Sequence, residues 1–270
     1  PFLGSGFSAE GLSFSKDGKQ MAYTWYPDGT LWVSNTDGSN RRQLTFPPLE
    51  VTGPRWSPDA TRISFTGREP DKAGQVYLVS LSDSHLQQIT SGSLDSGDAV
   101  WSPDSQSLIW GGSWDEVIPD KVPLHRIDLR SGRVTEIPGS IGLFSPRWSP
   151  DGRSLEATPQ DGSKILLYDF ARGNWQTLAG NLNVQYPTWT PDSKCIYFDN
   201  RRSDSGLTKD VMERLCVQSH KVEPILDASS AGPLLFGAAG WWTGLAPDGS
   251  ILATRDISSR EIYALDVKFP

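Results

Sequence analysis

Several features that would place a chain in a common functional class are missing here. The 270 residues include only 3 histidines, 2 cysteines and 2 methionines, and their formal net charge is −7. Nucleic-acid binders need a basic face that neutralises phosphates, so this acidic balance argues against such a partner. A bilayer-spanning helix needs roughly 18 consecutive apolar residues. Because no such run and no signal peptide occurs, we expect no membrane insertion by this chain.

Catalytic signatures are equally scarce. No G-x-S-x-G nucleophile elbow occurs, which argues against a hydrolase site within this chain. The histidines, His85, His125 and His220, are too scattered for a His-rich metal site. The S-x-D-x-G-x-x-W box of sialidases is also absent, because Asp and Gly are adjacent in the turns of this chain. We therefore expect no enzymatic activity, no metal and no cofactor.

Glycine and proline, by contrast, are abundant. The chain has 26 glycines and 20 prolines, spread without any low-complexity tract. Frequent turns with short elements between them are typical of an all-β chain. The sequence begins at Pro1 without an initiator methionine, so we expect it to be a piece of a longer protein.

One short turn recurs along the whole chain. Its aspartates are separated by 41 to 56 residues, a period typical of propeller blades. In its complete form the turn reads Trp-Ser-Pro-Asp-Gly. The copies are residues 14–18, 56–60, 101–105, 148–152, 189–193 and 245–249.

Each copy predicts one blade. Pro fixes φ at the second turn position, Asp bonds its own backbone and Gly adopts positive φ, so the chain reverses. Two apolar segments and a polar hairpin follow, which indicates four antiparallel strands per repeat. We therefore predict an all-β fold, a single six-bladed β-propeller domain over residues 1–270. Its blades are expected at residues 5–45, 46–90, 91–138, 139–179, 180–226, and 227–270 with 1–4.

The ring is expected to close through its N-terminal strand. The last repeat stops at Pro270 before a fourth strand, and Phe2 lies at the spacing before Phe14 that such a strand requires. Closure would protect the sheet edges from water. Large aromatic residues end most innermost strands and should pack between blades rather than bind a ligand. They are Trp56, Trp101, Trp148 and Trp189.

The repeat and the strands that follow it resemble the TolB-type six-bladed β-propeller over the whole chain. A finer likeness rests on residues 10–15, 26–32, 142–148, 240–242 and 255–266. These segments are similar to the C-terminal propellers of bacterial, notably acidobacterial, signalling proteins with a winged-helix DNA-binding domain or a serine/threonine kinase domain. The likeness implies a sensory or protein-interaction module on the outer side of the cytoplasmic membrane. A cytoplasmic location stays open.

Function is expected where the loops vary. Connections between second and third strands, and between a fourth strand and the next blade, gather on one face, called here the loop face. The starts of the innermost strands lie near its centre, and arginines and aromatics are common interface anchors. The longest connection is unusually apolar, so it either plugs the channel or forms a binding patch. The candidates for partner or ligand contact are Glu10, Arg55, Asp98, Arg147, Tyr186, Trp241 and Trp242.

Three further features leave alternatives open, and the first two concern charged residues. Arg55 and Arg147 could instead neutralise Glu10, Asp98 or Glu156 in a closed polar ring. Glu156, where other second strands have mostly apolar residues, either is a solvated strand end or has an arginine or several donors nearby.

The two cysteines could face each other across one hairpin. Cys195 and Cys216 fall in the second and third strands expected for blade five, and their midpoint lies in the loop between those strands. They are a candidate disulfide, and two free buried thiols are the alternative.

Two functional hypotheses from different classes follow. The first is a non-catalytic propeller that binds a protein or peptide as the sensory or interaction module of a larger signalling or transcriptional regulator. The second is a small-molecule binder, or a lyase- or hydrolase-type enzyme, that uses the channel mouth. A purely structural spacer is a third reading, since fold alone cannot choose among them.

Overall fold

The polypeptide reverses direction at each repeat because residues of the turn form hydrogen bonds with one another. In the second repeat, the Ser57 hydroxyl donates to Asp59 Oδ1, and the Arg62 amide donates back to Ser57 Oγ at 3.0 Å. Ala60 completes this turn at φ 57°, and Gly152 takes the same place in the fourth repeat at φ 77°. The predicted turn is confirmed, although its positive-φ position also accepts residues other than glycine.

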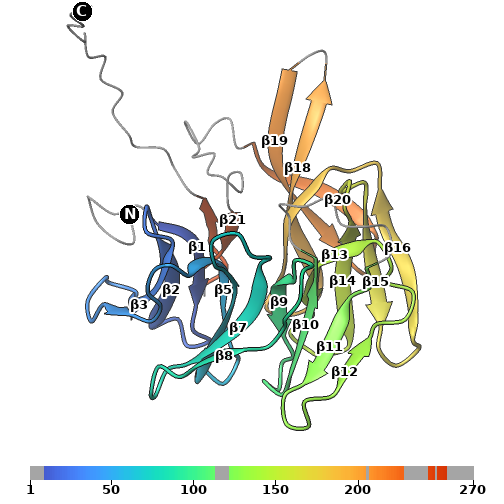
Figure 1. The fold of residues 1–270 in the computed structure, drawn as a ribbon. Coiled ribbons are helices and arrows are strands. Elements are labelled where there is room, and N and C mark those ends of the chain that lie inside the picture. The colour runs from blue at the N-terminus through green and yellow to red at the C-terminus, as the bar shows by residue number, and fades with distance from the viewer. Residues whose placement is uncertain (1–8, 113–121, 205–206, 228–242, 247, 254–270) are drawn as a thin grey trace, which may run out of the picture.

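The repeats fold into antiparallel sheets that stand around a common axis (Figure 1). The structure is a computed structural model and describes residues 9–112, 122–204, 207–227, 243–246 and 248–253. In each blade the strands follow one another from the innermost to the outermost position. No helical segment among these residues has the length and apolar character that crossing a bilayer requires.

Each complete blade contributes four strands. Those of the first two blades are β1 (Ala9–Phe14), β2 (Gln20–Trp25), β3 (Thr30–Asn35), β4 (Arg42–Gln43), β5 (Glu50–Trp56), β6 (Arg62–Arg68), β7 (Gln75–Ser80) and β8 (Leu86–Gln88). Those of the third and fourth are β9 (Gly97–Trp101), β10 (Ser107–Gly111), β11 (His125–Asp128), β12 (Val134–Glu136), β13 (Leu143–Trp148), β14 (Ser154–Pro159), β15 (Lys164–Asp169) and β16 (Asn174–Gly180). The remainder are β17 (Val184–Trp189), β18 (Cys195–Asp204), β19 (Leu207–Cys216), β20 (Lys221–Asp227), β21 (Thr243–Leu245) and β22 (Ile251–Ala253).

The predicted number of blades is wrong for the described residues. They form five four-stranded sheets, and the sixth repeat contributes only the two-stranded sheet of β21 and β22. The outer strands expected for that repeat fall in residues 254–270 and 1–4, which lie outside the described residues. The predicted closure by Phe2 lies outside them for the same reason. An all-β propeller of small antiparallel sheets is confirmed, with five complete blades instead of six.

The hydrophobic core lies between neighbouring blades. One cluster joins Val76 and Leu78 of blade two to Trp101 of blade three, and all of these side chains are buried. The Trp101 indole N–H also donates to the Arg55 carbonyl of the preceding blade at 3.1 Å. Trp56 and Trp189 donate in the same way to the preceding blade. The predicted role of these aromatics as packing residues between blades is thus confirmed for three of them.

Trp148 departs from this pattern. Its indole N–H donates to Gly152 within its own turn at 3.3 Å, and its ring stacks on Phe170 of the same blade with 4.8 Å between ring centroids. Contact with the preceding blade comes from Arg126, whose guanidinium carbon lies 5.1 Å from the Trp148 ring centroid. The ring therefore still lies between blades, but it makes no indole bond to its neighbour.

The fifth blade has the longest strands. Its β18 and β19 pair from Cys195–Cys216 as far as Asp204–Leu207. This hairpin projects beyond the ring at the top of Figure 1. Its tip points to the loop face, and the Pro-Asp turns lie at the opposite end, called here the turn face.

Candidate functional site

The innermost strand of each complete blade is interrupted by a β-bulge. The register of the first strand against the second shifts in all five complete blades. At each bulge one residue adopts positive φ, three positions before the aromatic that ends the strand. These residues are Gly11, Gly53, Asp98, Ser145 and Tyr186. Bulges re-aim side chains, and positive φ at residues other than glycine is uncommon and concentrates at functional sites.

A charged network connects the inner strands of three blades. Asp98 of blade three accepts from Arg55 of blade two, Nη2 to Oδ1 at 2.7 Å, and from Arg147 of blade four, Nη1 to Oδ2 at 2.8 Å. The Ser145 hydroxyl donates to Asp98 Oδ2 at 3.0 Å, and the Thr66 hydroxyl accepts from the Asp98 amide at 3.1 Å. The bulge in β9 thus places one carboxylate between two guanidinium groups.

The network keeps Asp98 ionised. Burial alone would raise its pKa, but the charges of Arg147 and Arg55 outweigh burial and lower the pKa to about 2. Burial and the charge of Arg147 lower the pKa of Arg55, and the Asp98 carboxylate opposes this shift. The Arg147 side chain is only 8% exposed, whereas that of Arg55 is 31% exposed. Arg55 is therefore the member of the network that remains accessible to a ligand.

Glu156 lies beside this network and is fully buried. It pairs with Arg147 across β13 and β14, and no described residue forms a hydrogen bond with either of its carboxylate oxygens. Burial raises its pKa well above the ordinary value; Arg147 opposes this rise and Asp98 adds to it. Burial therefore favours the neutral carboxylic acid over the carboxylate at Glu156. The reading as a solvated strand end is wrong, and an arginine is indeed its neighbour.

The structure brings together only part of the candidate set. Arg55, Asp98 and Arg147 form one network, and Tyr186 occupies the equivalent bulge of blade five, next to Pro187, whose carbonyl accepts from Arg147 Nε at 2.9 Å. The alternative in which the arginines neutralise Asp98 is the arrangement found for these three residues.

Other candidates lie partly or wholly outside the described residues. The Glu10 backbone pairs with Thr24, but its side chain is outside them, as are Trp241 and Trp242. Ser145 was missed by the sequence reasoning. Its offset of three residues before Trp148, shared with Asp98 before Trp101, is the signal that could have identified it.

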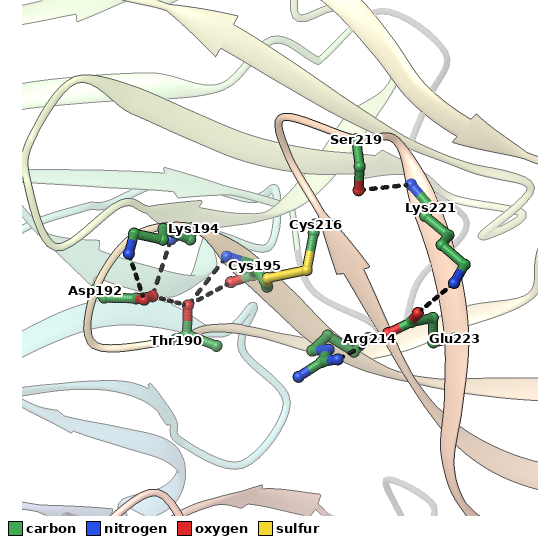
Figure 2. The surroundings of a disulfide bond; sticks show 9 residues. All are labelled: Thr190, Asp192, Lys194, Cys195, Arg214, Cys216, Ser219, Lys221 and Glu223. Atoms are coloured by element: carbon green, nitrogen blue, oxygen red, sulfur yellow. Dashed lines mark hydrogen bonds and ion pairs between the residues drawn. A yellow bond between two sulfur atoms is a disulfide. The ribbon is translucent and has the colours of Figure 1, made fainter.

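The two cysteines are joined. Cys195 on β18 and Cys216 on β19 lie directly opposite each other and form a disulfide with 4.0 Å between their Cα atoms. Figure 2 shows the bond between the Thr190–Asp192 turn and a cluster in which Lys221 and Arg214 lower the pKa of Glu223 to about 2. The bond closes the hairpin at its turn-face end, opposite the projecting tip.

Exposed apolar side chains concentrate on the loop face. Of the eight large apolar residues that are exposed in the described part of the chain, four lie in loops of this face. Two more lie near the end of β20 that leads to this face, and the other two lie on β8 and β12. The four loop residues are Tyr26, Phe46, Leu94 and Ile141, with exposed fractions from 57% to 65%. Such a distribution is typical of a protein-interaction surface.

A metal site would need a cluster of His, Cys, Asp or Glu side chains, because these are the usual ligands of metal ions. The described residues contain no group of three or more such side chains placed to hold an ion. His125 lies on β11 as expected and stacks on Trp110, with 5.5 Å between ring centroids. His85 and His220 lie in hairpins of the turn face. The three histidines are therefore well separated in the fold.

Among curated proteins, the chain is similar to enzymes named as peptidases. It is 27% identical over 169 residues to the uncharacterized peptidase YuxL of Bacillus subtilis, and 23% identical over 205 residues to tricorn protease homolog 1 of Streptomyces coelicolor. These matches cover 62% and 68% of this chain but 24% and 18% of the relatives. The chain therefore spans a quarter or less of the length of these relatives.

Solved structures share the fold. A putative TolB from Agrobacterium tumefaciens superimposes with a TM-score of 0.71 at 19% identity, covering 92% of this chain and 89% of that one. The oligogalacturonate lyase of Vibrio parahaemolyticus gives a TM-score of 0.69 at 13% identity, covering 94% and 76%. Identities this low show a common fold and no more. The likeness to winged-helix regulators and kinases stays a prediction.

A family model describes most of the chain directly. The model of the TolB beta propeller domain matches residues 11–214, from the bulge of β1 into β19. The matched region contains the aspartate turns of the complete blades and the Arg55–Asp98–Arg147 network. The chain belongs to the TolB beta propeller domain family.

Proposed function

We propose that this propeller is a non-catalytic module that binds a protein or peptide across its loop face. One observation carries the proposal, namely the concentration of exposed apolar side chains on that face. The first three connections between blades each present one of them, Phe46, Leu94 and Ile141. Isolated exposed apolar residues are ordinary, but their recurrence in successive loops of one face is typical of a docking surface.

Arg55 supplies a second kind of contact from the innermost strand β5, where it lies next to Trp56 near the turn-face end. Its guanidinium is held by Asp98 and its side chain is about one-third exposed, so it can donate to a partner group without a rearrangement of the network. Desolvated arginines near the middle of an interface commonly carry much of the binding energy. The proposal thus combines the exposed apolar side chains of the loop face with a charged group on an innermost strand.

Capture from the host's extract tests the proposal with matched surface variants. The triple variant Phe46→Ser/Leu94→Ser/Ile141→Ser removes the apolar side chains of the loop face. Leu86→Ser/Val134→Ser removes the exposed apolar residues of β8 and β12 and serves as the control. We expect a partner that is retained by the wild type and the control but lost by the triple variant. Identical retention by all three folded proteins would contradict the proposal.

The proposal extends to the role of the chain within a larger protein. The chain is proposed to be the sensing or interaction part of a larger signalling or transcriptional regulator, in line with the likeness of residues 142–148 and 240–242. Its named relatives are peptidases several times its length, and the chain itself carries no G-x-S-x-G elbow. A peptidase activity of this chain is therefore not proposed.

The disulfide supports a location in an oxidising compartment, such as the outer side of a bacterial cytoplasmic membrane. Alkylation of the protein from its host tests this location. We expect Cys195 and Cys216 to be modified only after reduction, which mass spectrometry would detect as two added alkyl groups. Modification without a reductant would place the protein in a reducing compartment.

A second candidate function is small-molecule binding or lyase-type chemistry at the channel mouth. The observation that favours it is Glu156, a buried acid beside Arg147 without a hydrogen-bond partner among the described residues. Oligogalacturonate is a suitable probe, because a lyase named for that substrate shares the fold. Depolymerisation that is lost in Glu156→Gln would favour this candidate. Unchanged oligogalacturonate after prolonged incubation with the wild type would remove it for this substrate.

A further inference from the structure

The outer part of blade two contains a pocket that none of the above functions uses. Its volume is about 440 Å³, which is large enough for a side chain or a small ligand. The walls come from the loop between β6 and β7, the outer strands β7 and β8, and the loop that leads to blade three. Its lining consists of Gly67, Glu69, Asp71, Lys72, Ala73, Gln75, Tyr77, Gln88, Gly92 and Ser93.

One wall of the pocket is a close contact between a glycine and an aromatic ring. Gly67 pairs with the first residue of β7, as Trp25 pairs with the first residue of β3 in blade one. Tyr77 is the counterpart of Trp32, and a Cβ on Gly67 would lie only 2.7 Å from its ring. The Tyr77 ring therefore packs directly against Gly67 and takes the space that a side chain there would need. Both residues line the pocket.

The walls of the pocket are held in place by buried polar groups. The Asp95 carboxylate, 3% exposed, accepts from the Gly74 amide and from Arg68 Nη2 at 3.0 Å. Gln75 Nε2 donates to the carbonyls of Gly92 and Leu94 at 3.3 and 3.2 Å. These bonds connect the loops on the two sides of the pocket. The cavity is thus formed before any ligand arrives, which lowers the entropic cost of binding.

One hydroxyl of a largely buried side chain lines the pocket without a hydrogen-bond partner. Tyr77 is only 8% exposed and lines the cavity, yet no described residue forms a hydrogen bond with its hydroxyl. Burial and the charge of Glu69 raise the pKa of Tyr77, while Lys72 opposes this rise. The hydroxyl is therefore neutral and free to bond an incoming group.

The charge of the lining favours a cation. Two carboxylates, Glu69 and Asp71, face one ammonium group, and Lys72 Nζ forms an ion pair with Glu69 Oε2. The Lys72 side chain is 66% exposed, so this pair lies in solvent and exchanges readily. The Lys72 ion pair therefore shows that Glu69 can bind a cation, and the Lys72 ammonium is the group that a cationic ligand would displace.

We propose that this pocket binds a cationic group on an apolar stem, namely the arginine or lysine side chain of a docking polypeptide. The stem would lie against Ala73 and the Tyr77 ring, and the charge would meet Glu69 and Asp71. The exposed Leu94 lies in the same loop as Gly92 and Ser93, so the pocket borders the proposed apolar surface. This inference rests on the proposed function, because it names a feature of the partner that binds the loop face. The acidic charge of the whole chain also favours a basic partner.

Calorimetric titration with small capped amino acids tests the pocket directly. The probes are N-acetyl-arginine amide and N-acetyl-lysine amide, with N-acetyl-glutamine amide as the neutral control. We expect saturable binding of at least one cationic probe and no binding of the neutral probe. The variant Glu69→Gln/Asp71→Asn should weaken the cationic probe about fivefold, the size expected for exposed ion pairs. Glu136→Gln, an exposed carboxylate on β12, is the matched control and should change nothing.

Lys72→Met gives the sharpest test, because it removes the competing ammonium group and keeps the length of the stem. We expect the cationic probe to bind more tightly to this variant, by a factor of about three to five. Weaker or unchanged binding would overturn the proposal, as would equal binding of the neutral probe. The pocket and the docking surface can be disproved separately. If the cationic probe binds but no partner depends on Phe46, Leu94 and Ile141, the pocket stands and the docking function is contradicted. The reverse result removes the pocket and keeps the docking surface.

Discussion

On the turn face, aspartates close the hairpins of the described blades, whereas the connections on the loop face share neither length nor composition. Asp59, Asp104 and Asp151 each accept from a hydroxyl two residues earlier and from an amide two residues later. These local bonds lower the pKa of the aspartates, as Ser102 and the Gln106 amide do for Asp104. These hydrogen bonds stay within one turn and do not depend on the neighbouring blades.

Bonds between blades also lie on the turn face. The Ser105 hydroxyl of blade three accepts from the Asp59 amide of blade two at 3.0 Å, and Ser193 of blade five does the same for Asp151 of blade four. The loop face instead presents exposed apolar side chains and a pocket. The comparison indicates that the repeated residues build the scaffold, and that specificity resides in positions where the repeat is broken.

The largest expected effect compares a repeated aromatic with an exposed one. Trp101→Ala should lower the free energy of unfolding by about 3–5 kcal/mol, because it opens a cavity between blades two and three and removes the bond to the Arg55 carbonyl. Phe46→Ala on the loop face should change it by no more than about 0.5 kcal/mol. Guanidinium unfolding of both variants gives the comparison. Similar losses would mean that the loop face is as important to stability as the core.

Asp98→Asn is expected to have the next largest effect. The variant leaves Arg55 and Arg147 facing each other without the carboxylate between them, which should cost about 3 kcal/mol. Asp28→Asn, in the exposed loop between β2 and β3, is the matched control.

The pH dependence follows from the lowered pKa of Asp98. The group is charged in the folded state down to about pH 2, whereas the ordinary value is 3.8. Its contribution to stability is thus fully present above pH 3.8 and is lost as the pH falls towards 2. The difference between wild type and variant should narrow over that range. A constant difference would show that Asp98 acts through packing and not through its charge.

Much of the scaffold was predictable, because one turn with a clear physical mechanism recurs along the chain. The position of every complete blade follows from the spacing of the turn aspartates, and the burial of Trp56, Trp101 and Trp189 follows from their place in the repeat. The count of six was not reached, because it depended on pairing residues 1–4 with residues near 270, and both segments lie outside the described residues.

The candidate site was predictable only in part. Arg55, Asp98 and Arg147 could be selected as residues near the axis, but their connection depends on a bulge in β9 that periodicity does not reveal. The pocket of blade two was missed because its lining comes from separate segments, residues 67–77, Gln88 and residues 92–93, that only the folded blade brings together.

Glu156→Gln tests the opposite kind of carboxyl group. Burial keeps Glu156 neutral in the folded state, whereas the unfolded chain ionises it above its ordinary pKa of 4.5. Wild-type stability should therefore fall as the pH rises above 4.5, and the variant should lack this loss. We expect the wild type and Glu156→Gln to have equal free energies of unfolding near pH 4. At higher pH the variant should be more stable than the wild type, by up to about 1.4 kcal/mol for each pH unit. Thermal unfolding across pH 4 to 8 measures the difference, and parallel curves would contradict a neutral Glu156.

The smallest expected effect concerns the bond between turns. Ser105→Ala removes the hydroxyl that accepts from the Asp59 amide and keeps a side chain at φ 60°, so it should cost about 1 kcal/mol. Ser105→Gly loses the same bond but relieves the positive φ, and should therefore cost less. Ala60→Gly, at the equivalent position of blade two, should stabilise the protein slightly because no hydroxyl is lost there. Urea unfolding ranks the three variants. If Ser105→Gly proves more damaging than Ser105→Ala, relief of the positive φ contributes little at this position, and the argument from backbone conformation is wrong.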